Sequence, residues 1–311
     1  MNRRRFLQSA TALAAAQHLL DSYVPAAATG TGIPLRPLGK TGEKVSMIGV
    51  GGFDISMPRE EKTALRMMDR AIELGATFFD NAWGYADGLS EERMGRVLSA
   101  PEKRQKVFLM TKVRARDAAG AQRQLEDSLR RLRTDLIDLW QFHELKDLQE
   151  VEAIFGPNGA MEAAQKARKA GQVRYIGFTG HVAPEPHLAM LERYDWDAVM
   201  MPINPADALW NSFQNRVLPK ALEKKCGIIA FKSLSRGRAL TRAYTVSESL
   251  RYVWSLPVSV LVSGMDRPEF LETNLELAMK FEPMSRAERE ALLARIKPYA
   301  GPEIEYYKKK S

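Results

Sequence analysis

Polar side chains suited to proton transfer stand at the ends of three successive apolar runs. Asp80 and Tyr85 close the segment ATFFDNAWGY, Lys112 ends VFLMTK, and His143 ends LIDLWQFH. A phenol has an ordinary pKa of about 10, so it is a poor acid near neutrality unless its surroundings help. A neighbouring ammonium stabilises the phenolate, a carboxylate balances the ammonium, and an imidazole orients a substrate oxygen or carries the proton. The set therefore predicts an enzyme that delivers a proton.

Taken singly, each of these residues is weak evidence. A lone tyrosine after a strand is usually a core or rim residue, a lone lysine can simply be solvated, and a lone histidine is more often structural. Four residues of suitable types at three consecutive strand ends are harder to explain as structural or solvated residues.

The elements that position this set are eight short apolar runs with helical segments between them. Strands that alternate with helices predict a parallel sheet with right-handed crossovers. Eight such units favour an α/β fold of the (β/α)8 TIM barrel type over an open doubly wound sheet, and the carboxyl ends of barrel strands share one face. The expected strands are residues 47–50, 77–80, 107–112, 136–143, 173–179, 198–203, 227–231 and 258–262.

The flanks of this repeating body have their own patterns. Residues 34–46 contain two short extended pieces around a Gly-Lys-Thr-Gly turn, which predicts an N-terminal β-hairpin. Residues 285–311 predict a C-terminal extra helix and a polar tail lying over the barrel. No Pro/Gly/Ser-rich linker interrupts the body, so residues 29–311 are expected to form one domain. Cys226, the one cysteine, excludes an internal disulfide and is expected to be a small core residue.

Residues 1–28 have the three parts of an export signal: a basic start, a short apolar middle and small residues before a cut. Ala26 and Ala28 fit an A-x-A cleavage site. The string from Arg3 to Leu7 resembles a twin-arginine signal, which implies the twin-arginine translocation machinery as a partner and a periplasmic location. The location is cytoplasmic if the signal is not used, and an amphipathic or disordered arm is the alternative. The apolar middle is too short and polar to span a membrane, so no stable membrane insertion of the mature chain is expected.

The composition argues against two other classes of function. The formal net charge of +8 is concentrated partly at the ends of the chain, and no nucleic-acid motif accompanies it, so no nucleic acid partner is expected. Only four histidines occur and none belongs to a clustered His/Asp pattern, so no metal site and no metal-assisted hydrolase is predicted.

The segment FDNAWGY resembles the FDTAxxY segment of the aldo-keto reductase superfamily. Further similarity lies in PLGKTGEKVSMIGVGGF, RYIGFTGH, SLSRGRAL and VSGMDRPEFLETNLELA, so that it covers residues 34–281. The resemblance implies that NADPH delivers hydride to an aldehyde or ketone and that Tyr85 protonates the oxygen. It further implies that Lys112 lowers the pKa of Tyr85, that Asp80 pairs with Lys112, and that His143 positions the carbonyl.

The resemblance also implies a binding site for NADP(H). Arg267 beside a 2′-phosphate would favour NADPH, because guanidinium pairs with phosphate in a bidentate manner. No GxGxxG fingerprint follows a strand, so a Rossmann site is not predicted. The implied cofactor-binding residues are Gly51, Gly52, Phe53, Thr179, Gly180, Phe231, Ser233, Leu234, Arg236, Gly264, Met265, Arg267 and Asn274.

Several of these positions depart from the family pattern. Thr179 and Gly180 stand where a Ser-Asn pair is common, Phe231 replaces a stacking tyrosine, and Lys232-Ser233 replaces a common Ser-Pro. These departures leave the choice between NADPH and NADH open. The expected rim of the substrate site is aromatic and consists of Phe53, Trp83, Trp140 and His181, with the alternative that Trp140 faces the helices.

Two functions remain open on the sequence. The first is an NADP-dependent aldo-keto reductase of the carbonyl reductase or alcohol dehydrogenase type, acting on a small-molecule carbonyl substrate. The second is a non-catalytic or weakly catalytic nicotinamide-nucleotide-binding or regulatory barrel. Export would separate a reductase from the source of NADPH, so the cofactor is carried out bound, or the signal is inefficient, or another redox cycle operates.

Overall fold

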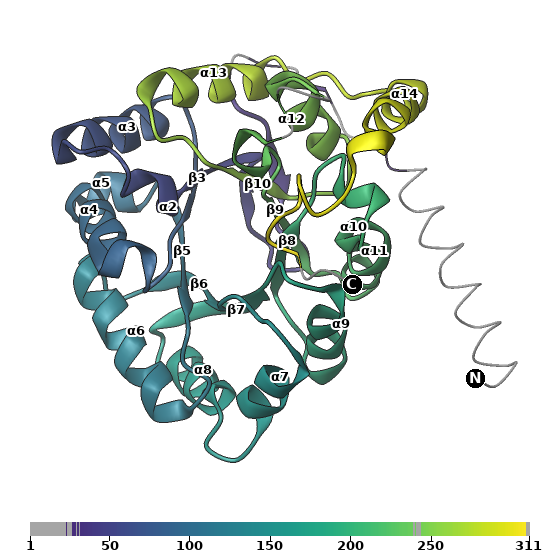
Figure 1. Ribbon diagram of the computed structural model, residues 1–311. Helices are drawn as coiled ribbons and strands as arrows, with labels where there is room; N and C mark the ends of the chain where they lie inside the picture. Colours follow the sequence, from purple (N-terminus) through teal and green to yellow (C-terminus); the bar gives the residue numbers. More distant parts are fainter. Residues whose placement is uncertain are drawn as a thin grey trace, which may run out of the picture.

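The computed structural model describes residues 32–238, 240 and 244–308, together with residues 23, 27, 28 and 30. Eight parallel strands close into a barrel in the order β10-β3-β4-β5-β6-β7-β8-β9, and the helices surround it (Figure 1). The predicted (β/α)8 barrel is confirmed, and each of the eight expected runs contains a strand. The strands are β3 (Ile48–Gly51), β4 (Phe78–Asp80), β5 (Phe108–Val113), β6 (Ile137–Phe142), β7 (Val173–Thr179), β8 (Ala198–Pro202), β9 (Gly227–Phe231) and β10 (Val260–Ser263).

The outer layer consists of helices whose first turns are often capped by side chains. Asp117 accepts a hydrogen bond from the backbone of Gly120, and Thr245 and Ser285 each form a capping box with a glutamate three residues later. The longer helices are α3 (Glu61–Glu73), α4 (Leu89–Leu98), α6 (Ala118–Leu132), α7 (Leu148–Phe155), α8 (Ala160–Lys169), α9 (Pro184–Arg193), α12 (Val246–Trp254), α13 (Pro268–Met279) and α14 (Arg286–Ile296). The shorter ones are α2 (Gly52–Ile55), α5 (Pro101–Arg104), α10 (Phe213–Arg216) and α11 (Leu218–Glu223), with 3-10 turns η1 (Tyr85–Gly88), η2 (Asp207–Leu209), η3 (Ser235–Gly237) and η4 (Lys297–Tyr299).

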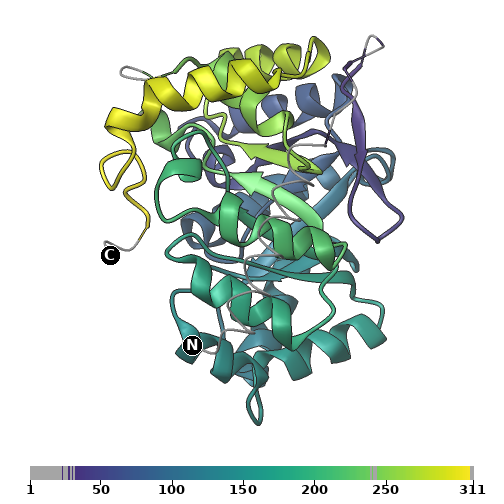
Figure 2. The same cartoon turned by 90° about the vertical axis from the view of Figure 1, so that its right-hand side faces the viewer.

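The predicted N-terminal hairpin is present as β1 (Leu35–Pro37) and β2 (Lys44–Ser46), paired antiparallel. Leu38 and Val45 from this hairpin are buried in the cluster that fills the barrel interior. The hairpin and the C-terminal segment lie on opposite sides of the barrel in Figure 2. The hairpin therefore covers one end of the barrel and leaves the other end to the loops that follow the strands.

The barrel strands are buried on both faces, as parallel strands between a core and a helix layer must be. Leu139 belongs to the interior cluster, whereas Trp140, the next residue of β6, packs in the larger cluster beneath the helices. Trp140 is 1% exposed and does not line the substrate rim, so that prediction is wrong and the alternative holds. Cys226 is buried in the same outer cluster, which confirms it as a core residue.

The C-terminal extra helix is confirmed as α14, but the segment after it is not simply a polar covering. The Lys308 side chain is fully buried and pairs with Asp207, at 2.6 Å, and with Glu305. Asn204 donates a hydrogen bond to Glu305 over 2.8 Å and a second to the hydroxyl of Tyr307 over 3.0 Å. Burying a charge is costly unless it is paired, so these contacts anchor the tail at a defined place.

The signal-peptide prediction for residues 1–28 falls almost wholly outside the described residues. The backbone N–H of Ala28 donates to the carbonyl of Phe281 over 3.0 Å, at the predicted end of that segment. Among the residues that the structure describes, no helix has both the length and the apolar character needed to cross a membrane.

Candidate active site

The residues with proton-transfer chemistry meet at the C-terminal end of the barrel. Asp80 ends β4, Lys112 lies near the end of β5, His143 follows β6, and Tyr85 begins η1. The Nζ atom of Lys112 donates to Asp80 Oδ1, to the Asn81 carbonyl over 2.7 Å and to the Tyr85 hydroxyl over 3.2 Å. The rings of Tyr85 and His143 meet edge to face with centroids 5.6 Å apart. The structure thus brings together all four residues that the sequence singled out.

The ion pair at the base of this site is enclosed by protein. Lys112 is 1% exposed and Asp80 is 2% exposed. Burial lowers the pKa of Lys112 and raises the pKa of Asp80, and in both groups the charge of the partner opposes that shift. The Asn81 carbonyl gives the ammonium a third acceptor. An ammonium with these partners is held in one position beside the phenol.

The pKa of Tyr85 moves opposite to the sequence-based expectation. Burial raises this pKa well above 10, the carboxylates of Asp80, Asp54 and Glu144 raise it further, and Arg114 opposes them. The expected net lowering does not occur in this state of the protein, because burial penalises the phenolate and Asp80 offsets the charge of the Lys112 ammonium. Tyr85 is therefore a protonated phenol, the form that a proton donor requires.

His143 is a neutral imidazole. Burial lowers its pKa well below 6.5, and the positive charges of Lys112 and Arg114 add to the effect. Its backbone is held on both sides, since its N–H donates to Val113 over 2.8 Å and Arg116 donates to its carbonyl. Its Nδ1 atom is buried and has no hydrogen-bond partner in the described part of the chain.

Glycines bring the ends of neighbouring strands close together around this site. A Cβ on Gly52 would lie 2.2 Å from the Asp80 carbonyl oxygen, and one on Gly51 would lie 2.8 Å from that of Ser263. A Cβ on Gly264 would lie 2.7 Å from the Asp54 carboxylate, and one on Gly180 would lie 2.7 Å from the Leu145 carbonyl oxygen. Any other residue would force these segments apart, so the expected cofactor-binding glycines are required by packing as well.

The comparison with known proteins decides the family. The profile of the Aldo/keto reductase family matches residues 47–252. The chain belongs to this family. YrpG, an uncharacterized oxidoreductase of Bacillus subtilis, is 31% identical over 223 residues, which are 64% of this chain and 66% of that protein. The aldo-keto reductase yakc [NADP(+)] of Schizosaccharomyces pombe is 29% identical over 227 residues, 68% of this chain and 64% of the relative.

The barrel of this family member also matches solved structures. The holo form of aldo-keto reductase AKR11C1 from Bacillus halodurans superposes with a TM-score of 0.71 at 24% identity, over 84% of this chain and 96% of that one. At this identity the likeness supports the fold. In sequence, the chain spans slightly less than two thirds of the length of the relatives named above. Members of the aldo-keto reductase family are oxidoreductases that use nicotinamide cofactors.

The remaining cofactor candidates of this aldo-keto reductase fall into two groups. Exposed or partly exposed candidates are Phe53, Phe231, Leu234, Arg236 and Arg267. Buried ones are Thr179, Ser233, Met265 and Asn274. Asn274 donates to the hydroxyl of Ser263 over 3.1 Å, so its amide is already engaged within the fold. The first group is the one whose side chains are available to a ligand.

The residues expected to form the aromatic rim of the substrate site also fall into two groups. The ring of Phe53 meets Tyr85 edge to face at 5.5 Å, and the Arg236 guanidinium lies 5.2 Å from the Phe53 ring. Trp83 instead donates to Asp127 of α6 over 3.2 Å and is covered by Arg131. Phe53 and His181 therefore remain as rim residues, while Trp83 is tied to the helix layer.

Two functional candidates were missed in the sequence. Asp54, in α2, lies against Gly264, and burial together with Asp266 raises its pKa to about 6. Lys232 follows β9 directly and is a partly buried ammonium at the same end of the barrel. The sequence marked Lys232 only as a departure from the family pattern and did not mark Asp54, because burial and neighbours from distant parts of the chain distinguish these residues.

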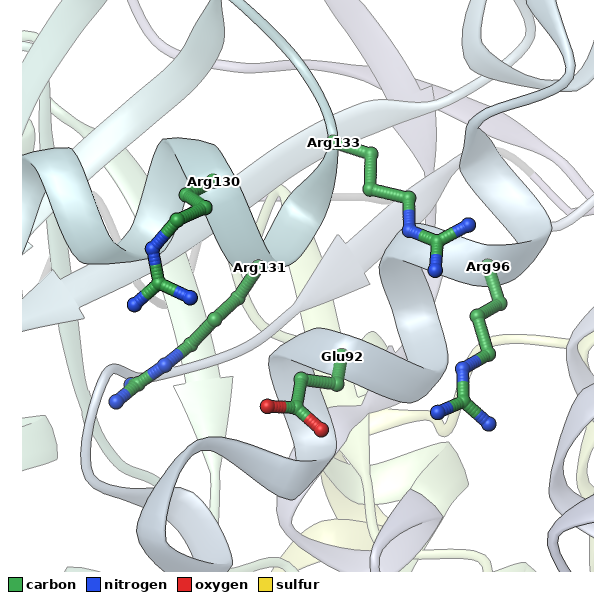
Figure 3. A pocket seen from close by; sticks show the side chains of 5 residues that line it. All are labelled: Glu92, Arg96, Arg130, Arg131 and Arg133. Atoms are coloured by element: carbon green, nitrogen blue, oxygen red, sulfur yellow. The ribbon is translucent and has the colours of Figure 1, made fainter.

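A second concave feature lies on the helix layer. It is a pocket of about 190 Å³ lined by Glu92, Arg96, Arg130, Arg131 and Arg133, from α4 and the C-terminal end of α6 (Figure 3). Arg130 pairs with Asp127 at 2.7 Å, Arg131 pairs with Glu91 at 3.4 Å, and Arg96 pairs with Glu61. Three of its four cations are thus already paired, and none of its lining residues belongs to the proton-transfer set.

Proposed function

We propose that this chain is an NADP(H)-dependent oxidoreductase that reduces an aldehyde or ketone to an alcohol, with Tyr85 as the general acid. The observation that carries the proposal is the 3.2 Å contact from Lys112 Nζ to the Tyr85 hydroxyl, with the His143 ring edge to face against Tyr85. A neutral phenol next to a fixed ammonium is a proton donor whose product, the phenolate, is stabilised where it forms. The named activities of the relatives are consistent with this chemistry.

The residues at the strand ends fit a nicotinamide cofactor. Gly51 and Gly264 follow the last residues that pair β3 with β10, and Arg267, whose side chain is exposed, occupies the N-cap position of α13. A helix N-terminus and an arginine favour a phosphate group. We therefore assign Gly264 and Arg267 to the adenosine phosphate, and Gly51, Gly52 and Phe53 to the nicotinamide side. A bound NADPH supplies the hydride.

The protein's own part in the reaction is proton delivery and positioning. The ring nitrogen of His143 holds the carbonyl oxygen beside the phenol, so that the Tyr85 O–H donates its proton as negative charge develops on that oxygen. Lys112 then faces the phenolate across the same 3.2 Å contact, and Asp80 keeps the ammonium in place. The other cofactor assignments, to Thr179, Gly180, Phe231, Ser233, Leu234, Arg236, Met265 and Asn274, belong to this proposal.

The test uses the protein from residue 29 onward, with NADPH oxidation followed at 340 nm over a panel of aldehydes and ketones. Tyr85→Phe is expected to lose general-acid catalysis, a factor of about 10² to 10⁴, while its NADPH affinity by fluorescence stays unchanged. Tyr299→Phe, at a tyrosine that is 45% exposed, is the matched control and is expected to keep wild-type rates. NADPH binding without turnover of any carbonyl by the wild type would instead support a regulatory, nucleotide-binding barrel.

We propose that the N-terminal segment is a twin-arginine signal that directs export of the folded enzyme and is removed after Ala28. The mature chain, residues 29–311, is then periplasmic. It does not insert in the membrane and binds no nucleic acid. The basis is the motif in residues 1–28. In a bacterium with this export route, full-length protein is expected in the periplasm beginning at Thr29. The double variant Arg3→Lys with Arg4→Lys is expected to remain cytoplasmic. Cytoplasmic wild-type protein with an intact N-terminus would contradict the proposal.

A further inference from the structure

Lys232 is an ammonium at the active-site end of the barrel that has no ion-pair partner among the residues that the structure describes. Its Nζ atom lies 5.7 Å from the ring centroid of Phe231 and 5.4 Å from that of Tyr307. Within the described ranges of the chain, this nitrogen makes no hydrogen bond and no ion pair. The side chain is partly buried, and burial lowers its pKa. Two aromatic faces hold a cation less strongly than a carboxylate or phosphate does.

The backbone at Lys232 shows that lysine is not there for the fold. Its φ angle is 63°, in the left-handed region that strains a residue with a Cβ and that glycine adopts readily. The conformation is held from both sides, since the Lys232 carbonyl accepts from Ser235 over 3.1 Å and from Asn204 over 3.4 Å. Glycine would satisfy both contacts without strain, so the feature that lysine adds is its ammonium.

The carboxylates around Lys232 are few and mostly engaged. Glu144, which faces it, already pairs with Arg114 at 3.3 Å and lies 3.7 Å from His181. Asp54 is shared with Arg236. Lys112 and Arg236 add positive charge on the same side. The surroundings therefore leave Lys232 with uncompensated positive charge directed at this end of the barrel.

Lys232 lies on the side of the site where the substrate oxygen is expected. His181 shares both of its aromatic neighbours, with ring centroids 6.1 Å from Phe231 and 5.7 Å from Tyr307. Burial and the charges of Lys232 and Lys146 lower the pKa of His181 to about 4, so His181 is neutral and does not compete for an anion. A protonated His181 and the Lys112 ammonium would each lower the pKa of His143, so His181 lies near the proton-transfer set.

We propose that Lys232 is a specificity-determining residue that binds a carboxylate group on the carbonyl substrate. The preferred substrates are then oxo acids and carboxylate-bearing aldehydes rather than neutral carbonyls. The inference rests on the proposed function, because it concerns the substrate reduced at Tyr85. The ammonium leaves the two rings and forms a charge-assisted hydrogen bond, while Tyr307 remains as a wall of that subsite.

The test compares two substrates of nearly the same shape and opposite charge state, the anion 4-carboxybenzaldehyde and its neutral amide, 4-formylbenzamide, in the wild type and in the variants. The wild type is expected to favour the carboxylate in kcat/KM by about tenfold or more, the value of one hydrogen bond to a charged group. Lys232→Gln and Lys232→Gly are expected to lose this preference, so that their kcat/KM values for the two aldehydes become similar. Added salt should lower the wild-type rate with the carboxylate only.

Two further measurements separate the alternatives. Lys232→Gly is expected to unfold at the wild-type denaturant midpoint or above it, since strain is removed; a lower midpoint would mean that the side chain is structural. NADPH affinity by fluorescence is expected to be unchanged in both variants. Weaker NADPH binding with an unchanged carboxylate-to-amide ratio would place the ammonium on a cofactor phosphate and overturn the inference.

The inference and the proposed function fail in different ways. If the wild type reduces both aldehydes and the ratio is the same in all three proteins, the assignment of Lys232 is wrong and the reductase stands. If the wild type reduces no carbonyl at all, both are wrong.

Discussion

The Nζ atom of Lys112 lies 3.2 Å from the hydroxyl oxygen of Tyr85, and the same ammonium is bonded to Asp80. Lys112 belongs to β5 and Asp80 to the neighbouring strand β4, while Tyr85 follows in η1. The closed barrel aligns these strand ends and leaves the ammonium no freedom to move away from the phenol. Proton delivery therefore depends on one buried charge and its carboxylate partner, which makes this pair the first point to test.

Replacement of Lys112 by methionine is expected to abolish reduction and to destabilise the fold. It leaves the Asp80 carboxylate buried and unpaired, and breaking a buried pair in this way costs about 3–5 kcal/mol in the free energy of unfolding. Urea unfolding measures the loss. The double variant Lys112→Met with Asp80→Asn is expected to recover most of the stability and none of the activity. Equal destabilisation of the single and double variants would contradict this account.

Neither His143 nor Tyr85 is expected to titrate in the rate of carbonyl reduction between about pH 6.5 and 10, the ordinary pKa values of histidine and tyrosine. His143 has its pKa lowered well below 6.5 and Tyr85 has its pKa raised well above 10, so neither group titrates in this window. The measurement is kcat at saturating cofactor and carbonyl. A titration near pH 6.5 that disappears in His143→Gln would show that the imidazole is not neutral.

Asp54→Asn is expected to stabilise the protein above pH 6. The pKa of Asp54 is raised to about 6 in the fold, so the native state binds this proton more tightly than the unfolded chain does. The stability that proton binding contributes is therefore lost as pH rises through about 6. At pH 8 the variant should exceed the wild type by up to about 3 kcal/mol, and near pH 4 the two should agree.

Urea unfolding at the two pH values provides the measurement for Asp54. Asp135→Asn, at an exposed aspartate, is the matched control and should change stability little at either pH. A stability difference for Asp54→Asn that does not depend on pH would contradict the assignment.

Lys308→Met is expected to release the C-terminal segment. The Lys308 ammonium joins Asp207 to Glu305, and its removal leaves two buried carboxylates without their cation at a cost of about 3–5 kcal/mol. The expected results are a lower Tm and faster proteolysis near Tyr307. Lys280→Met, which removes an exposed helical pair, should leave both unchanged. Intact protease resistance in Lys308→Met would show that packing alone holds the tail.

The barrel and the four proton-transfer residues at its end could be predicted from the sequence. Strand and helix periods are local properties, so the eight runs and the helices between them were readable without a structure. In a parallel barrel all carboxyl ends meet on one face, which is why Asp80, Tyr85, Lys112 and His143 could be placed together from their positions in the chain.

Side-chain positions and pKa shifts that depend on burial or on distant partners required the folded structure. Trp140 could not be assigned to one face from its pattern, because both faces of a barrel strand are apolar. The direction of the Tyr85 pKa shift follows from desolvation, which no motif encodes. Lys308 reaches Asp207 across 101 positions of the chain, and Lys232 meets Tyr307 only because the tail is anchored there. Such contacts are set by how the chain closes on itself, and that closure is a property of the whole fold.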